Sequence, residues 1–128
     1  MAMEKRRILL VDDESTILKV VGKRLEASGF DVIIAEDGFE ALAKARVERP
    51  DLIVLDLMMP KMDGFQVCSE LKRDPHCRAI PVVIFTGKGT DADAQICRKL
   101  GISAYAHKAN GSANLLQEIF RLLPKNGA

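Results

Sequence analysis

The sequence predicts an α/β domain in which five parallel strands form one doubly wound sheet with five helices on its two faces. Short apolar runs alternate along the chain with longer stretches whose apolar residues recur every three or four positions, the pattern of alternating strands and helices. The run at Leu52–Leu55 is apolar at every position, as in a parallel strand buried on both faces. Right-handed crossovers then place helices on both faces of the sheet.

Length and composition predict a single domain over residues 1–128. The chain is 48% hydrophobic, enough for a sizeable core, and its 19 basic and 18 acidic residues leave a net charge of +1. The basic residues are scattered, so we expect no direct contact with nucleic acid or a membrane. Without a signal sequence or an apolar run of membrane-spanning length, we expect a cytoplasmic protein. The odd number of cysteines and their spacing favour buried thiols over disulfides or a metal site: Cys68, Cys77 and Cys97.

The first half of the chain predicts three strands joined by two helices. The strands are expected at Arg7–Val11, Asp31–Ala35 and Leu52–Leu55. The first helix begins at Ser15 and ends before Gly29, a residue typical of helix ends. Asp37 is expected to cap the second helix, which ends at Arg49-Pro50. We expect the buried face of this second helix to consist of its larger residues: Phe39, Leu42, Ala43, Arg46 and Val47.

The second half predicts two more strands and three more helices. The strands are expected at 81–86 and, at a sheet edge, 103–108. A helix that starts after Gly64 ends at Asp74-Pro75, and a more polar helix over 91–100 ends at Gly101. The last helix, over 112–123, ends at Pro124 and is expected to pack inward through Leu115, Leu116, Ile119, Phe120 and Leu123.

Polar side chains follow the strands where the apolar runs end. The first strand leads to Asp12 and Asp13, the third to Asp56, the fourth to Thr86 and the fifth to Lys108. Since neighbouring parallel strands lie ~5 Å apart and end at the same edge, these side chains converge if their strands are neighbours. Each has a simpler alternative: the first two acids can begin a helix, the threonine can bond to backbone, and the lysine can lie in solvent.

Three carboxylates at one point require a cation to offset their repulsion. Oxygen ligands with several retained waters favour Mg²⁺. The remaining lysine and hydroxyl suit an anionic tetrahedral group, so the set as a whole matches aspartyl-phosphate formation.

These residues resemble the receiver domain of two-component response regulators, of which the chemotaxis response regulator is the smallest form. The resemblance covers nearly the whole chain and consists of Asp12-Asp13, Asp56, Met59-Pro60, Met62-Asp63-Gly64, Thr86-Gly87 and Lys108 in this order and spacing. It implies the flavodoxin-like strand order 2-1-3-4-5 and cytoplasmic phosphorelay signalling.

The resemblance also implies a role for each site residue. Asp56 would be the phosphoacceptor, and Lys108 would contact the phosphoryl group. Mg²⁺ would be bound directly by Asp13, by Asp56 and by the backbone carbonyl of Met58, and through water by Asp12. Thr86 and Tyr105 would form the switch.

By the same resemblance, the phosphoryl group would come from a histidine kinase, a phosphotransfer protein or a small acyl phosphate. The switch would change the face made by the fourth helix, fifth strand and fifth helix. That face would bind a downstream protein or effector domain, or a second copy of the chain in a phosphorylation-dependent dimer. Whether the chain is a complete regulator or part of a longer one is left open by the sequence.

Two other function classes use the same features. Phosphatases with an aspartyl nucleophile carry a second carboxylate two residues later as general acid, whereas this chain has Met58 there. A pseudo-receiver that serves only as an interaction module would be expected to have lost Asp13, Asp56 or Lys108, and all three are present. We therefore expect a phosphoacceptor switch and not an enzyme with rapid turnover.

Two positions affect the details of the site. Met58 and Lys88 flank the path of the attacking water in receiver-like sites, and a thioether cannot orient water as an amide can, so autodephosphorylation is expected to be slow.

Receivers usually place proline after the strand-five lysine, through a cis bond, but Ala109 stands here. Because a non-proline cis bond costs roughly 3 kcal/mol, we expect a trans bond, with Asn110-Gly111 adjusting the chain path.

Overall fold

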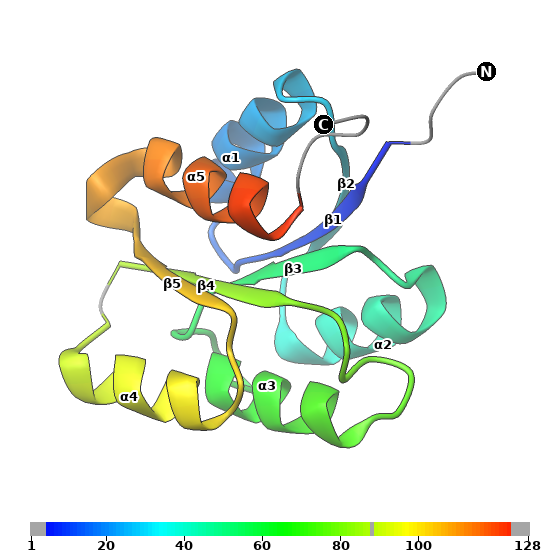
Figure 1. Ribbon diagram of the computed structural model, residues 1–128, viewed down its shortest axis with the longest axis vertical. Helices are drawn as coiled ribbons and strands as arrows, with labels where there is room; N and C mark the ends of the chain where they lie inside the picture. Colours follow the sequence, from blue (N-terminus) through cyan, green and yellow to red (C-terminus); the bar gives the residue numbers. More distant parts are fainter. Residues whose placement is uncertain (1–4, 88, 124–128) are drawn as a thin grey trace.

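The structure is a computed structural model that describes residues 5–87 and 89–123, and it shows one parallel sheet between two layers of helices. Figure 1 shows α1 and α5 on one face of the sheet and α2, α3 and α4 on the other. The elements are β1 (Arg7–Val11), α1 (Ser15–Ala27), β2 (Asp31–Ala35), α2 (Gly38–Glu48), β3 (Leu52–Leu55), α3 (Gly64–Arg73), β4 (Val82–Thr86), α4 (Asp91–Lys99), β5 (Ala104–His107), the 3-10 helix η1 (Lys108–Asn110) and α5 (Gly111–Leu122).

The strand order is β2-β1-β3-β4-β5, so the predicted fold class is confirmed. β1 pairs in parallel with both β2 and β3, and β3 in turn pairs with β4. The chain therefore builds outward from β1 to the β2 edge and then returns across β1 to the β3 side. Ligands of such sheets bind beyond the carboxyl ends of the strands, at the point where the order reverses.

The continuous apolar runs of β1 and β3 are explained by two separate cores. Along β1, Leu9 and Val11 belong to the core under α2, α3 and α4, whereas Ile8 and Leu10 belong to the core under α1 and α5. β3 alternates in the same way, and all four of its residues are buried. Because successive side chains point to opposite faces, a strand covered on both sides has no polar position.

Side-chain caps fix where three of the helices begin. The Asp37 carboxylate accepts a hydrogen bond from the backbone N–H of Glu40 at 2.8 Å, which confirms it as the cap of α2. Reciprocal capping boxes start α3, from Asp63, and α4, from Thr90. The start of α3 follows directly from the loop after β3, so this cap also fixes the path of that loop.

The predicted buried face of α2 is wrong. Phe39 and Val47 are 57% and 79% exposed, whereas Ala41 and Ala45 are the residues that pack inward. Ala43 and Arg46 are also exposed, and only Leu42 of the expected face packs against the core. α2 lies so close to α3 that a Cβ on Gly38 would come within 2.8 Å of Val67, so small residues must form the contact.

The last strand is shorter than expected. β5 ends at His107, so Lys108 lies just beyond the strand, at the start of η1. The Lys108–Ala109 peptide bond is trans, as predicted. Gly111 follows with a positive φ of 79°, whereas φ of Asn110 is −86°, so only the glycine takes a positive φ there. Pro124, expected to end the last helix, lies outside the described residues.

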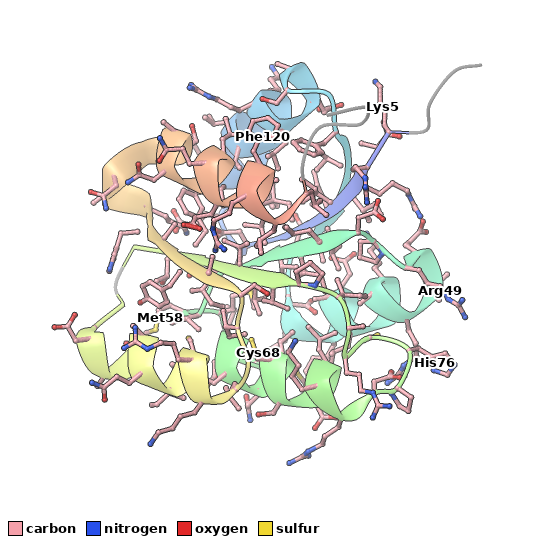
Figure 2. All side chains as sticks on the ribbon, viewed as in Figure 1. Lys5, Arg49, Met58, Cys68, His76 and Phe120 are labelled. Atoms are coloured by element: carbon pink, nitrogen blue, oxygen red, sulfur yellow. The ribbon has the colours of Figure 1, made fainter. Side chains whose placement is uncertain are left out.

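The three cysteines are free and buried, in agreement with the sequence prediction. Cys68 lies on the buried side of α3 (Figure 2), where burial raises the pKa of its thiol to about 12. Burial likewise raises the pKa of Cys97 to about 11. Thiols with such pKa values are protonated at neutral pH and therefore unreactive. No helix among the described residues has both the length and the apolar character needed to cross a bilayer.

Asp74 connects α2 to the end of α3. Its carboxylate accepts hydrogen bonds from the backbone N–H of His76 at 2.8 Å and from the Arg46 guanidinium at 2.6 Å. The His76 ring, at the periphery of the molecule (Figure 2), lies 3.3 Å from the same carboxylate. These bonds, with that from the His76 backbone foremost, lower the pKa of Asp74 to about 2.

We predict that Asp74→Asn destabilises the fold at pH 7 but not in acid. Because the folded pKa of about 2 lies below the ordinary value, the ionised carboxylate stabilises the fold at neutral pH. That contribution is lost as the pH falls from about 4 toward 2. Urea unfolding at a series of pH values should show the difference between variant and wild type shrinking below pH 4. Glu26→Gln, at an exposed site on α1, is the control; a difference independent of pH would contradict the assignment.

Candidate functional site

The carboxyl ends of four strands meet at one edge of the sheet. Asp12 follows β1, Asp56 follows β3, Thr86 is the last residue of β4, and Lys108 follows β5. Since β1, β3, β4 and β5 are consecutive neighbours in the sheet, their ends bring these side chains together. A pocket at this edge is lined by Asp13, Glu14, Asp56, Met58, Thr86, Gly87 and Lys108.

Three carboxylates form the floor of this site. Ligand oxygens of Asp12, Asp13 and Asp56 all lie within 4.8 Å of one another. Asp12 and Asp56 are only 1% and 3% exposed, while Asp13 is exposed to solvent. The loop bonds hold two of them in place: Asp12 accepts from the backbone N–H of Glu14 at 2.9 Å, and Asp56 from that of Met58 at 3.3 Å.

Lys108 reaches back over these carboxylates. Its Nζ lies 2.7 Å from Asp12 and 3.2 Å from Asp56. Burial alone would lower the pKa of this ammonium, but the hydrogen bond to Asp12 and the charge of Asp56 outweigh it and raise the pKa. Lys108 is therefore a permanent cation at neutral pH, positioned against the acid that ends β3.

One ammonium does not offset three carboxylates. Burial raises the pKa of Asp12, and the charge of Asp56 adds to this effect despite the opposing bonds from Lys108 and the Glu14 backbone. The ionised form of the cluster thus remains costly with Lys108 in place. A hard divalent cation bound by oxygen atoms would relieve that cost, and carboxylates are its preferred ligands. The residues present fit such an ion.

Thr86 lines the same pocket, and its hydroxyl has no partner among the described residues. Thr86 is fully buried, and its Oγ1 accepts or donates no hydrogen bond among the described residues. A buried hydroxyl left unpaired costs about 1–3 kcal/mol. An oxyanion bound above Asp56 would supply the missing acceptor.

The comparisons with known proteins agree with this geometry. The family model described as the response regulator receiver domain matches residues 8–120. The chain belongs to the response regulator receiver family.

Receiver relatives were found both by sequence and by structure. This receiver is 45% identical over 103 residues to the alkaline phosphatase synthesis transcriptional regulatory protein PhoP of Bacillus subtilis, a match that covers 80% of this chain and 42% of PhoP. It is 40% identical over 123 residues to the probable transcriptional regulator ycf27 of Cyanophora paradoxa, covering 96% of this chain and 50% of that protein. The receiver thus spans half or less of the length of these curated relatives.

Solved structures give the same result for the fold. The chemotaxis protein CheY4 of Vibrio cholerae superposes with a TM-score of 0.87 at 30% sequence identity, covering 94% of this receiver and all of that chain. The match to a chemotaxis regulator confirms the recognition made from the sequence motifs.

Glu14 is a residue of the receiver site that the sequence argument did not single out. Its carboxylate lies 3.3 Å from Lys108 Nζ and, unlike Asp12 and Asp56, is largely exposed. The sequence feature that could have identified Glu14 is its position directly after Asp12-Asp13. An acid at that position is equally well explained by the positive end of a helix dipole. Only the position of Lys108, more than ninety residues later, makes Glu14 part of the pocket.

The loop after β3 is built on Gly64. A Cβ at this position would lie 2.5 Å from the carbonyl oxygen of Asp56 and 2.7 Å from Cα of Leu57, both backbone atoms that cannot move aside. The Gly64 N–H donates to the Leu57 carbonyl at 2.9 Å, which closes the loop. Lys61 takes a positive φ of 69° at the turn. The close approach at Gly64 therefore fixes the backbone next to Asp56.

We predict that Gly64→Ala lowers the free energy of unfolding by about 1–3 kcal/mol, the range found for overpacked sites, because its Cβ overlaps backbone. Gly22→Ala is the matched control: that glycine lies buried in α1, and its Cβ would meet nothing nearer than a Leu10 methyl at 4.0 Å. Urea denaturation measures both. Equal effects of the two substitutions would show that the loop can yield at residue 64.

Proposed function

We propose that this receiver takes up one phosphoryl group on Asp56 and acts as a switch in a two-component signalling pathway. The observation that carries the proposal is the convergence of one buried carboxylate with a cation and an unpaired hydroxyl: Lys108 lies 3.2 Å from Asp56, and Thr86 lines the same pocket. A nucleophile, a positive charge and a hydroxyl around one point suit an incoming phosphoryl group.

We propose Mg²⁺ as the cofactor of this site. Asp13, Asp56 and the backbone carbonyl of Met58 would bind it directly, and Asp12 would bind it through water. The three clustered carboxylates support this assignment, because they offer only hard oxygen ligands and carry more charge than Lys108 offsets. The bound ion would supply charge neutralisation for the phosphoryl oxygens.

The transfer itself requires little from the protein. An oxygen of Asp56 attacks phosphorus, and the bond from phosphorus to the donor's imidazole nitrogen, or to the oxygen of a small acyl phosphate, breaks. The electron pair stays with the donor, which leaves as carboxylate or, when its other ring nitrogen already carries a proton, as neutral imidazole. Lys108 neutralises charge on the group in transit, so this receiver contributes positioning and electrostatics. We class it as a phosphoacceptor with slow loss of phosphate and not as an enzyme.

The signal would leave through Thr86 and Tyr105. Once phosphorylated, Asp56 offers oxygens that accept from the Thr86 hydroxyl and draw it inward. Tyr105, on the neighbouring strand β5, responds to the space near Thr86, so the face formed by α4, β5 and α5 changes shape. A local charge event thereby shifts the balance between two arrangements of that face.

The partners follow from these roles. The phosphodonor is a histidine kinase, a phosphotransfer protein or a small acyl phosphate, and the output is a downstream protein, an effector domain or a phosphorylation-dependent dimer. The curated relatives are named as transcriptional regulators, and the matched segments cover only 42% and 50% of their lengths. The remaining length of these relatives supports an effector domain as the output of the receiver. We propose that residues 1–128 form one cytoplasmic receiver domain that itself contacts neither nucleic acid nor membrane.

A phosphatase of the aspartyl-nucleophile class is disfavoured by Met58. Such an enzyme needs a carboxylic acid two residues after the nucleophile, and this receiver has a thioether there, 55% exposed on the rim of the pocket. A pseudo-receiver is disfavoured because Asp13, Asp56 and Lys108 all remain and meet in one pocket.

We predict that acetyl phosphate adds one phosphoryl group per chain only when Mg²⁺ is present and that Asp56→Asn abolishes the addition. Intact-mass measurement and phosphate-affinity gels detect it. The matched control is Asp31→Asn, which changes an exposed carboxylate at the start of β2. Asp51 is less suitable as a control because its carboxylate accepts a hydrogen bond from the backbone N–H of Arg7. Undiminished labelling of Asp56→Asn would refute the assignment of the phosphoacceptor.

We predict that Met58→Asn speeds the loss of phosphate, on the order of tenfold, because an amide can orient the attacking water and a thioether cannot. The decay of the phosphorylated protein after removal of the donor gives the rate. Met58→Leu, which keeps the side chain apolar, should leave the rate unchanged. An Asn variant as slow as wild type would disprove this account. Lys88, the other residue expected to flank the water path, lies outside the described residues.

A further inference from the structure

The phenol of Tyr105 points inward in this structure. Its hydroxyl is buried and has no hydrogen-bond partner among the described residues. The hydroxyl occupies the space where a side chain at residue 89 would begin: an ideal Cβ on Gly89 would lie 1.3 Å from the Tyr105 oxygen and 2.6 Å from Cζ. It would also lie 2.8 Å from the Cγ2 methyl of Thr86. Gly89, Thr86 and Tyr105 therefore share one small volume beside the phosphoryl pocket.

Backbone conformation does not explain the glycine at 89. The glycines with positive φ among the described residues are Gly29, Gly101 and Gly111, so Gly89 has a conformation open to other residues. Space does explain it, because an alanine Cβ at 89 and the inward phenol cannot coexist. Gly87, two residues earlier, is different: its Cβ would meet only the Lys108 side chain, at an ordinary 3.7 Å.

We propose that Gly89 is a positioning residue of the switch: the space it leaves lets Tyr105 take the inward position before phosphorylation, so residue 89 sets how far phosphorylation can move the phenol. The inference rests on the proposed switch role of Thr86 and Tyr105 and limits the part that Tyr105 plays in it. With the phenol already inward, phosphorylation moves mainly Thr86, and a bulkier residue 89 would restore a larger movement of Tyr105. On this account, the face formed by α4, β5 and α5 already favours the arrangement with Tyr105 inward before phosphorylation.

Packing holds the phenol inward, without a hydrogen bond at its end. The ring makes an edge contact with His107, with centroids 5.2 Å apart, and its end lies against Gly89 and Thr86. The unpaired hydroxyl opposes this burial by about 1–3 kcal/mol. The inward position is therefore a bias that a single methyl group at residue 89 can reverse, and not a locked state.

The composition of the chain offers a direct optical test. Tyr105 is the single tyrosine, and there is no tryptophan, so fluorescence and phenol absorbance report on this residue alone. Burial raises the pKa of the phenol, with smaller contributions from Cys97, Asp93, Asp56 and Asp91. A phenol displaced into solvent would titrate closer to the ordinary value of about 10.

The experiment compares the full chain with Gly89→Ala, and with Gly22→Ala as the control for an added methyl in α1. We expect wild type and Gly22→Ala to resist acrylamide quenching and to titrate above the ordinary value. For Gly89→Ala we expect the titration midpoint to shift down toward about 10 and the quenching constant to rise toward that of the urea-unfolded chain. Wild-type behaviour of Gly89→Ala would overturn the proposal, as would a wild-type tyrosine that is quenched like an exposed one.

Acetyl phosphate with Mg²⁺ provides the second arm. A wild-type phenol that is inward at rest should show little change in quenching when the mass increases by one phosphoryl group. A large fall in quenching on phosphorylation would show that the phenol rests outward and would overturn the inference. Failure of the wild type to gain mass would instead refute the proposed function, and the comparison of unphosphorylated variants would still decide the position of Tyr105.

A double-mutant cycle separates the Tyr105 contact from general damage to the loop. If Gly89→Ala destabilises because its methyl displaces the phenol, its cost in urea unfolding should fall in a Tyr105→Leu background, where that end group is absent. An equal cost in both backgrounds would assign the effect to the loop itself and would count against the proposal.

Discussion

The repulsion among three carboxylates at the carboxyl edge of an apolar sheet is the constraint on which the site depends. Water would offset this repulsion in solution, but Asp12 and Asp56 are almost fully buried. The β1 and β3 backbones that carry them cannot separate, because the two strands are paired and enclosed by core on both faces. The stability of the sheet therefore keeps these carboxylates together despite the electrostatic repulsion between them. A cation bound among these carboxylates would lower the cost of that repulsion.

Two glycines let the backbone and a side chain come close enough to use that cluster. Gly64 permits the loop after β3 to fold against the backbone of Asp56 and Leu57, and Gly89 leaves room for the end of Tyr105. Neither has a positive φ, so both are required by space. The first fixes the backbone at Asp56, whereas the second leaves space for a side chain on β5. The two glycines thus set the packing on both sides of the pocket at Asp56.

The elements far from this edge have a different role. The hydrogen bonds of Asp74 to Arg46 and His76 connect α2 to the end of α3. Arg7 donates to Glu48 and binds Asp51 through its backbone N–H, which joins β1 to the chain between α2 and β3. These contacts lie at or near the amino end of the sheet. They stabilise the fold without contacting the pocket, so stability and chemistry are carried by separate sets of polar residues.

The sequence alone determined the fold class, the order of elements and the polar residues that lie at or just beyond the carboxyl ends of the strands. It could do so because strand and helix periodicity is local and because parallel strands end at a common edge. The sequence did not determine which face of α2 is buried, because the close approach of α3 favours alanines over the larger Phe39 and Val47. It also missed Glu14, whose contact with Lys108 joins residues distant in the chain. The inward phenol of Tyr105 was decided by tertiary structure as well, because only packing brings β5 against the loop at Gly89.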